Sequence, residues 1–306
     1  MKALVTGGAG FIGVNLCHRL LKLNYEVICL DNFYSSRYEN IKELLPNVKF
    51  TLIEHDIREP FDIECDIIFN LACPASPLFY QKDPIYTSET NYLGMRNVLN
   101  CALKYNAKVL QASTSEVYGN PDKNHHPQKE DYFGNVNPNG IRSCYDEGKR
   151  IAEQLCIDYH LKYNLDVYIV RIFNTYGPYM RFDDGRVVTN FIYQALNNKD
   201  ITIYGNGEQT RCLQYIDDLI DGILLLIKSD YHYPVNIGNP IEYTINEIAD
   251  MILKECNSSS KKIYKELPKD DPVRRKPNID LAFNILGWRP KIDFLVGLNR
   301  MLKNII

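Results

Sequence analysis

A tyrosine and a lysine four residues apart are the residues of this 306-residue chain whose types and spacing most clearly allow catalysis. At this spacing Tyr145 and Lys149 would lie on one face of a helix. A neighbouring ammonium favours the phenolate and lowers the pKa of the phenol. Tyr145 could then take a proton from a substrate hydroxyl while hydride leaves the same carbon. Lys149 could also hold the nicotinamide ribose of a dinucleotide.

A strand with a polar end precedes this pair. Thr114 and Glu116 close the segment Gln111–Glu116, whose carboxyl end should open onto a cofactor crevice. Thr114 could hydrogen bond the reacting hydroxyl, and Glu116 is a candidate base or orienting group. Both residue types are also common helix caps, so a structural role stays open for each. The second match to the spacing, Tyr38 with Lys42, follows no such strand and is interpreted as chance.

A glycine-rich segment near the N-terminus indicates a dinucleotide site. Gly7, Gly10 and Gly13 follow a first strand and open a helix, which lets the backbone approach a pyrophosphate. The next strand runs into Asp31, whose carboxylate can accept hydrogen bonds from ribose hydroxyls and would repel a 2′-phosphate. The sequence therefore predicts NAD and not NADP. Asp56, after the third strand, suits either the adenine amino group or a loop cap.

Short apolar runs alternate with amphipathic stretches, which predicts an α/β fold with a Rossmann doubly wound parallel sheet. The expected strands are Lys2–Thr6, Glu26–Leu30, Lys49–Ile53, Asp66–Leu71, Lys108–Ala112, Asp166–Ile172 and Pro234–Gly238; the expected helices include Ile12–Lys22, Asn91–Tyr105, Tyr145–Tyr163 and Leu213–Ile227. Residues 1–176 plus 213–238 should form the NAD-binding domain. Residues 177–212 plus 239–306 should form a smaller, discontinuous C-terminal substrate-binding lobe.

Composition argues against several classes of function. The formal net charge of -3 provides no basic field for nucleic acid or an anionic membrane surface. No apolar run reaches membrane-spanning length, and the first strand starts too early for a signal peptide, so we expect a cytoplasmic protein. The nine cysteines are an odd number without a CxxC pair. This indicates reduced thiols and no metal site.

Several stretches resemble one known family from end to end. They are Leu71–Pro77, Ala112–Gly119, Asn137–Lys149, Arg171–Pro178, Asp183–Asn190 and Asp270–Pro277. They closely resemble the UDP-glucuronate decarboxylases, or UDP-xylose synthases, which are extended short-chain dehydrogenases/reductases of the NAD-dependent epimerase/dehydratase family. Ser115 discriminates most, because the related dTDP-glucose 4,6-dehydratases have Asp there to expel water. Its absence here suits a reaction whose leaving group is carbon dioxide.

The resemblance implies roles for individual residues. A 4-keto intermediate would form and lose carbon dioxide, with bound NAD recycled, and Arg275 or a water near Glu116 would take part in protonating C5. The implied catalytic residues are Thr114, Glu116, Tyr145, Lys149 and Arg275. The implied NAD contacts are Gly7, Gly10, Phe11, Ile12, Gly13, Asp31, Asn32, Tyr34, Ser35, Ser36, Asp56, Ile57, Leu71, Cys73, Thr90, Tyr145, Lys149 and Thr175. The implied UDP-sugar contacts are Tyr80, Asn174, Arg186, Val188, Tyr204, Gln209, Arg211 and Arg275.

Two departures from the family pattern each remove a positive charge. Glu89 stands where Lys is common and has no evident compensation, whereas Arg181 could compensate for Tyr179, which replaces a common Arg. The helices Asn91–Tyr105 and Tyr145–Tyr163 resemble those of an intersubunit four-helix bundle, which implies a homodimer. The alternatives are a nucleotide-sugar 4-epimerase or 4,6-dehydratase, a bifunctional apiose/xylose synthase, a decarboxylase that releases the 4-keto pentose and NADH, and a non-catalytic dinucleotide-binding regulator.

Overall fold

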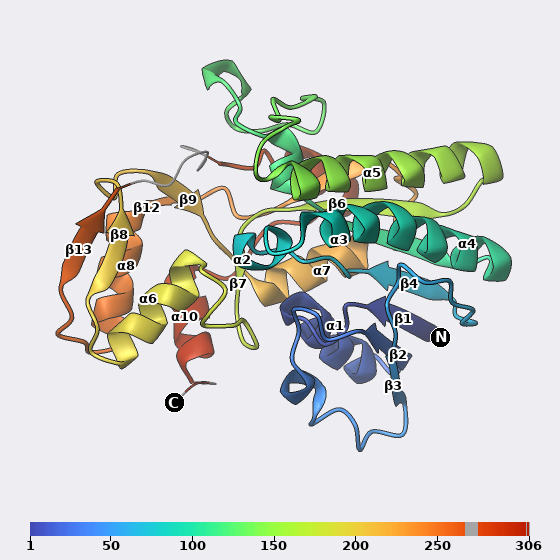
Figure 1. Ribbon diagram of the computed structural model, residues 1–306, viewed down its shortest axis with the longest axis horizontal. Coiled ribbons are helices and arrows are strands. Elements are labelled where there is room, and N and C mark those ends of the chain that lie inside the picture. Colours follow the sequence, from blue (N-terminus) through green and yellow to red (C-terminus); the bar gives the residue numbers. More distant parts are fainter. Residues whose placement is uncertain (267–274, 304, 306) are drawn as a thin grey trace.

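A seven-stranded parallel sheet forms the centre of the molecule (Figure 1). The computed structural model describes residues 1–266, 275–303 and 305. The strand order is β11-β6-β5-β4-β1-β2-β3, and every neighbouring pair is parallel. The strands are β1 (Lys2–Thr6), β2 (Glu26–Asp31), β3 (Phe50–Glu54), β4 (Ile67–Asn70), β5 (Lys108–Thr114), β6 (Val167–Ile172) and β11 (Pro234–Ile237). The prediction of a Rossmann sheet is confirmed, and all expected strands are present with small shifts at their ends.

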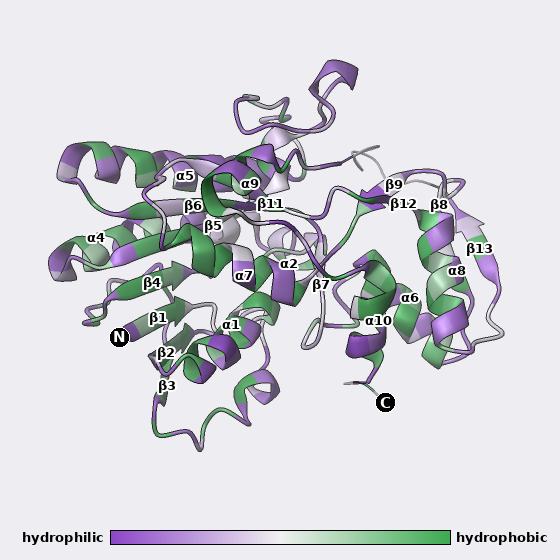
Figure 2. Cartoon of the chain, turned by 180° about the vertical axis from the view of Figure 1, so that it is seen from behind, coloured by the Kyte–Doolittle hydropathy of each residue, from purple (hydrophilic) through white to green (hydrophobic). Residues whose placement is uncertain are grey.

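Helices cover both faces of this sheet. α4 (Met95–Tyr105) and α5 (Ser143–Tyr163) lie on one face, and α1 (Phe11–Lys22) and α7 (Ile216–Leu226) lie on the other (Figure 1). Each helix buries one apolar stripe, so the core has a layer on each side of the sheet. Figure 2 shows hydrophobic residues along strands such as β1 and β4. The chain order reverses between β1 and β4, where such folds form a ligand crevice.

The helical run before α4 is longer than the sequence pattern predicted. α3 (Pro84–Glu89) continues through a π-helical turn, η2 (Thr90–Gly94), into α4. The predicted start at Asn91 is therefore wrong. The Asp83 side chain caps α3 by accepting a hydrogen bond from the Tyr86 N–H at 2.9 Å, and Pro84 occupies the first helical position. Likewise, α7 begins three residues later than predicted because Gln214–Tyr215 form a short strand, β10.

A second group of elements lies beyond the sheet, at the end opposite the chain's N-terminus (Figure 1). α6 packs on α8, and the strand pairs β8–β13 and β9–β12 flank them. The remaining elements are α2 (Pro77–Tyr80), η3 (Ser115–Tyr118), β7 (Thr175–Tyr176), α6 (Val187–Leu196), β8 (Ile201–Tyr204), β9 (Thr210–Cys212), β12 (Glu242–Thr244), α8 (Ile245–Glu255), β13 (Lys262–Lys265), α9 (Asp280–Leu286), α10 (Phe294–Leu302), η1 (Tyr38–Ile41) and η4 (Lys123–His125). The exact domain boundaries stay a prediction. Within the described part of the chain, no helix is long and apolar enough to cross a membrane.

Candidate active site

The glycine-rich turn between β1 and α1 is shaped for close approach of a ligand. Gly7 has a φ of 67°, and a Cβ there would lie 2.9 Å from Ala72 of the loop after β4. A Cβ at Gly13 would lie 2.2 Å from the Gly7 carbonyl oxygen. The N-cap of α1 is Gly10, which offers no capping side chain to the first N–H groups of the helix. These features fit a dinucleotide pyrophosphate at the start of α1.

Asp31 joins this turn to the loop after β2. Its carboxylate accepts hydrogen bonds from the N–H groups of Ala9 and Phe33, both at 2.9 Å, and from the Ser36 hydroxyl at 2.7 Å. Asp31 is therefore not a helix cap; it is fixed at the carboxyl end of β2. Carboxylate oxygens have further lone pairs, so Asp31 can still accept hydrogen bonds from ribose hydroxyls.

An aromatic and ionic wall joins the loops after β2 and β3 to α3. The Arg58 guanidinium binds Asp56, forms an ion pair with Glu89 at 2.7 Å, and lies 4.1 Å from the centre of the Tyr86 ring. Tyr86 in turn stacks on Tyr34 with 4.2 Å between ring centres. Glu89 thus has a compensating cation in Arg58, which corrects the expectation from the sequence.

The loop-cap role of Asp56 is present, since its carboxylate accepts hydrogen bonds from the Arg58 N–H and from Asn32. Burial raises the pKa of Asp56, but the hydrogen bonds from Arg58 outweigh burial, so the net pKa lies below its ordinary value. The adenine contact of Asp56 stays a prediction.

Tyr179 and Arg181 connect the loop after β7 to the dinucleotide side. The Tyr179 hydroxyl lies 3.1 Å from Nε2 of His18, and the two rings stack with 5.7 Å between their centres. Arg181 donates to the Ser35 carbonyl at 3.2 Å and is paired with Asp183. Arg181 therefore contacts the loop that holds Ser35 and Ser36 while its charge is paired with Asp183, and its compensating role stays a prediction.

Tyr145 is buried at the start of α5, and its environment differs from the one the sequence predicted. Burial raises the pKa of its phenol above the ordinary value, and the neighbouring Cys73 thiol raises it further. A hydrogen bond with Thr114 and the charge of Arg186 act in the opposite direction. The prediction of a lowered pKa is therefore wrong for this structure.

Lys149 explains part of this difference. Its ammonium donates to the Ala112 carbonyl at 2.8 Å and lies 5.8 Å from the centre of the Tyr145 ring. The four-residue spacing does place both side chains on one side of α5, next to the end of β5. Burial nevertheless dominates the pKa of the phenol. The cap role of Thr114 is present, because its hydroxyl accepts a hydrogen bond from the Glu116 N–H at 3.3 Å at the start of η3; its contact with the reacting hydroxyl stays a prediction.

Glu116 lies between two arginines. One carboxylate oxygen pairs with Arg142 and the other with Arg275. The Arg275 side chain is buried and also donates to the Gly119 carbonyl at 3.3 Å; burial lowers the pKa of its guanidinium to about 10. Ten N–H donors of two guanidiniums meet one carboxylate here, so the pair retains capacity for a second oxyanion.

Two buried polar atoms beside these arginines lack partners among the described residues. They are the Tyr80 hydroxyl and Oδ1 of Asp146. The Tyr80 ring stacks on Tyr145 with 5.1 Å between ring centres, and Oδ2 of Asp146 lies 3.7 Å from Arg142. Burial raises the pKa of Asp146 to about 6, although Arg142 lowers it. Unpaired buried groups are costly, so their clustering beside two arginines points to a polar ligand.

Arg142 is the functional candidate that the sequence interpretation missed. It lies three residues before Tyr145, at the N-cap of α5, and therefore on the same side of the helix as Tyr145 and Asp146. That spacing was a usable signal. The other catalytic candidates, Thr114, Glu116, Tyr145, Lys149 and Arg275, are brought together as the resemblance implied. Of the stretch Asp270–Pro277, residues 270–274 lie outside the described residues.

The expected NAD contacts come from the carboxyl ends of neighbouring strands. Phe11 and Ile12 open α1, Leu71 and Cys73 follow β4, and Ile57 packs against Gly94. Asn91 donates to the Cys73 sulfur at 3.2 Å, which ties the β4 loop to the helical run containing Thr90. The Thr175 hydroxyl donates to the Phe173 carbonyl at 2.8 Å in the turn after β6.

The expected UDP-sugar contacts occupy two regions. Arg186 donates to the Ala75 carbonyl at 3.2 Å, and its positive charge acts against the burial that raises the pKa of Tyr145. Arg186 therefore lies near the catalytic candidates. Gln209 donates to the Tyr204 carbonyl at 2.6 Å within the second group of elements. The others are Asn174 in the turn after β6, Val188 buried in α6, and Arg211 on β9.

Comparison with known proteins agrees with this geometry. Residues 3–238 match the model of the NAD dependent epimerase/dehydratase family. The chain belongs to this family. It is 48% identical to UDP-glucuronic acid decarboxylase 1 of Arabidopsis thaliana over 99% of this chain and 69% of that protein, and 48% identical to UDP-glucuronic acid decarboxylase 5 of the same plant over 98% and 88%. The predicted family is confirmed.

A solved structure is also similar over the whole chain. The UDP-glucuronic acid 4-epimerase of Bacillus cereus, in complex with UDP-glucuronic acid and NAD, matches with a TM-score of 0.88 and 30% identity. The match covers 100% of this chain and 99% of the epimerase. This chain is therefore similar both to proteins named UDP-glucuronic acid decarboxylase and to a UDP-glucuronic acid 4-epimerase.

Proposed function

We propose that this chain decarboxylates UDP-glucuronate to UDP-xylose with bound, recycled NAD. The observation that carries the proposal is the meeting of Arg142 and Arg275 on Glu116, beside the stacked Tyr80 and Tyr145 rings. These arginines offer donors for a sugar carboxylate next to the group that handles the sugar hydroxyl. The relatives named UDP-glucuronic acid decarboxylase support the same substrate and reaction.

The residues around the glycine-rich turn fit NAD. The first turn of α1 would hold the pyrophosphate and Asp31 the adenosine ribose, while Lys149 would hold the nicotinamide ribose. When bound, NAD supplies an oxidised, positively charged ring that accepts the hydride of sugar C4 and returns it at the end of the cycle. The positive charge of the bound ring would favour the Tyr145 phenolate and so oppose the burial that raises the pKa of this phenol.

Tyr145 and Thr114 act on the 4-hydroxyl of the sugar. Tyr145 takes the hydroxyl proton, and the hydrogen bond from Thr114 orients the phenol. The oxidised sugar is a β-keto acid, because its C6 carboxylate is two carbons from the C4 carbonyl. The C5–C6 bond then breaks, carbon dioxide leaves, and the electron pair moves into the C4 carbonyl as an enolate. Tyr145 and Thr114 donate to that oxygen.

C5 takes one proton after carbon dioxide has left. Arg275, or a water held near Glu116, is proposed to deliver it. The net reaction consumes one proton and UDP-glucuronate and forms UDP-xylose and carbon dioxide. Ser115 follows Thr114 where a dehydratase needs an acid to protonate a departing hydroxyl. A serine is a poor acid for that step, which favours decarboxylation over loss of water.

The remaining groups are proposed to bind the nucleotide part of the substrate. Arg211 and Arg275 would contact the diphosphate, Tyr204 and Val188 would lie near the uracil, and Asn174 and Tyr80 would contact the sugar. In this assignment residues 1–176 plus 213–238 bind NAD and also supply Tyr80 and Asn174 to the sugar, and the smaller lobe supplies the other contacts.

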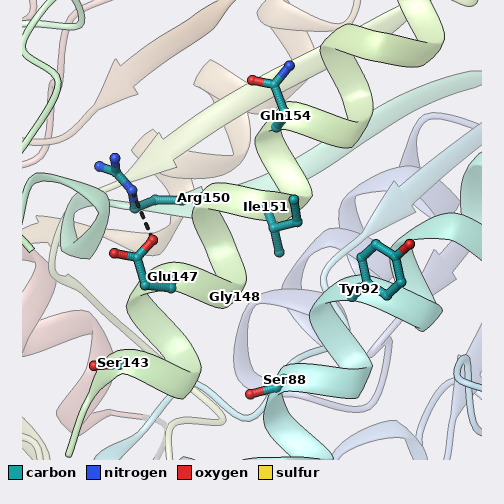
Figure 3. Close-up of a pocket in the computed structure, with 8 residues that line it drawn as sticks. All are labelled: Ser88, Tyr92, Ser143, Glu147, Gly148, Arg150, Ile151 and Gln154. Atoms are coloured by element: carbon teal, nitrogen blue, oxygen red, sulfur yellow. Dashed lines mark ion pairs between the residues drawn. The ribbon is translucent and has the colours of Figure 1, made fainter. Parts of the chain in front are cut away.

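We also propose a homodimer through α4 and α5. Tyr92, Leu103, Ile151, Leu161 and Tyr163 are between 38% and 69% exposed on this helical region. A hollow of about 530 Å³ lies between α5 and the α3–η2 run. Figure 3 shows Tyr92 on one side of it and Ile151 on the other. Apolar side chains of this kind suit a two-fold interface. Light scattering should give twice the monomer mass, and a monomer would contradict the dimer.

The function is tested by incubating the purified protein with NAD and UDP-glucuronate. We expect UDP-xylose and carbon dioxide, identified by NMR and mass, without net NADH. A 4-epimerase would return UDP-galacturonate with C6 retained, and a 4-keto-pentose producer would release NADH with each carbon dioxide. An unchanged substrate would overturn the proposal.

A further inference from the structure

The segment that carries Arg275 is fastened to one buried glutamine. Gln128 is fully buried, and its backbone N–H donates to the Lys276 backbone carbonyl at 2.9 Å. Its side-chain Oε1 accepts a hydrogen bond from the Lys276 backbone N–H at 2.9 Å, and its backbone carbonyl accepts one from the Asn278 backbone N–H at 2.8 Å. Both backbone polar groups of the residue next to Arg275 therefore bind Gln128.

The segment that carries Glu116 is fastened to the same place. Tyr118, two residues after Glu116 on η3, donates to Oδ1 of Asn236 at 2.7 Å. Asn236 is fully buried on β11, and its Nδ2 donates to the carbonyls of Gln128 and Asn278 at 3.1 and 3.2 Å. One amide thus joins the chain after Glu116 to the chain after Arg275.

A buried ion pair holds this junction on the sheet. Arg171 of β6 binds Glu153 of α5 at 2.8 Å and donates to the Tyr118 hydroxyl at 2.9 Å. β6 and α5 are core elements, and α5 also carries Tyr145 and Lys149. The contacts of Tyr118 and Asn236 are therefore fixed to the same part of the structure as these two catalytic candidates.

We propose that Gln128 and Asn236 are positioning residues that set Arg275 against Glu116. The inference rests on the proposed function, because it concerns the same Glu116–Arg275 pair. Neither amide touches the reacting atoms; each acts through the backbone on either side of the pair. Misplacement of a catalytic group by about 1 Å can cost about 100-fold in rate. Loss of the Gln128 side-chain bonds should therefore lower kcat by about 10- to 100-fold.

A double-mutant cycle separates positioning from a merely structural role. Gln128→Met keeps the side-chain length and removes the acceptor for Lys276 N–H. We expect kcat to fall in the wild-type background and to change less than about 2-fold in an Arg275→Ala background, because coupled residues are not additive. Equal losses in both backgrounds would overturn the inference.

Gln194→Met is the matched control. Gln194 is a half-buried amide that joins α6 to β8 through two hydrogen bonds with Thr202, at 3.1 and 3.2 Å. It should leave kcat and NAD content unchanged. If Gln128→Met does not fold, Asn236→Asp serves the same cycle, because it keeps the acceptor for Tyr118 and removes the donor to Gln128 and Asn278.

Hydrogen exchange provides a readout that needs no turnover. The Lys276 amide should exchange faster in Gln128→Met and at the wild-type rate in Gln194→Met. Unchanged exchange at Lys276 would overturn the inference even if the wild type is fully active. A wild type that is inactive on UDP-glucuronate, with the exchange result as expected, would instead overturn the proposed function alone.

Discussion

Replacing Arg142 with glutamine should weaken binding of the sugar carboxylate selectively. Arg142 pairs with Glu116, and its side chain is 22% exposed. A hydrogen bond to a charged group contributes about 1.5–3 kcal/mol, and partial exposure favours the lower half of that range. At about 1.4 kcal/mol per tenfold, the Kd of UDP-glucuronate should rise by about 10- to 40-fold. The Kd of UDP should change less than about 2-fold, because UDP lacks the carboxylate.

Calorimetry in a Tyr145→Phe background measures both ligands without turnover. Arg289→Gln is the matched control. Each arginine lies over an aromatic ring, Arg142 at 6.0 Å from the centre of Tyr80 and Arg289 at 3.8 Å from the centre of Phe283, but Arg289 lies outside the catalytic group. It should change neither Kd. Equal weakening of UDP and UDP-glucuronate by Arg142→Gln would refute the carboxylate role. So would a wild-type Kd for UDP-glucuronate combined with a lowered kcat.

Three further outcomes are expected. Arg58→Met should raise the Kd of NAD by about 10-fold, measured by NADH fluorescence. Glu89→Gln should raise this Kd less than about 3-fold, because the half-exposed ion pair of Glu89 with Arg58 is weak. Equal effects of the two variants would contradict this prediction. Asp146→Asn should have a free energy of unfolding about 1–2 kcal/mol above that of the wild type at pH 7.5, because burial raises the pKa of Asp146 to about 6 and penalises its charged form above that pH. This gain should shrink as the pH falls through about 6 toward 4, and a pH-independent difference in Tm would contradict the prediction. Tyr145→Phe should lower kcat at least about 100-fold with NAD binding retained, and a smaller loss in kcat would remove Tyr145 from the chemistry.

Local patterns were sufficient to predict the sheet and the NAD crevice. The apolar runs match the parallel strands, and the glycines after β1 and Asp31 at the end of β2 lie where the fingerprint requires. The helix start at Asp83-Pro84 was also readable, because an Asp N-cap followed by Pro is a local signal.

Long-range pairing and burial could not be read in the same way. Arg58 and Glu89 are distant in sequence, and only the packing of the β3 loop against α3 shows that they compensate each other. The spacing of Tyr145 and Lys149 predicted their shared side of the helix but not the burial that raises the pKa of the phenol. Arg275 likewise pairs with Glu116 and donates to the Gly119 carbonyl, and its neighbour Lys276 binds Gln128, all far away along the chain.

Turnover of UDP-glucuronate in D2O with catalytic NAD tests the proposed decarboxylation most directly. The decarboxylation mechanism predicts UDP-xylose with one solvent-derived deuterium at C5, none at C4, and one carbon dioxide per product. Deuterium at C5 is required because the C5–C6 electron pair is replaced by a solvent proton, and protium at C4 shows that the same hydride returns. A UDP-hexuronate product without carbon dioxide would contradict the decarboxylase mechanism.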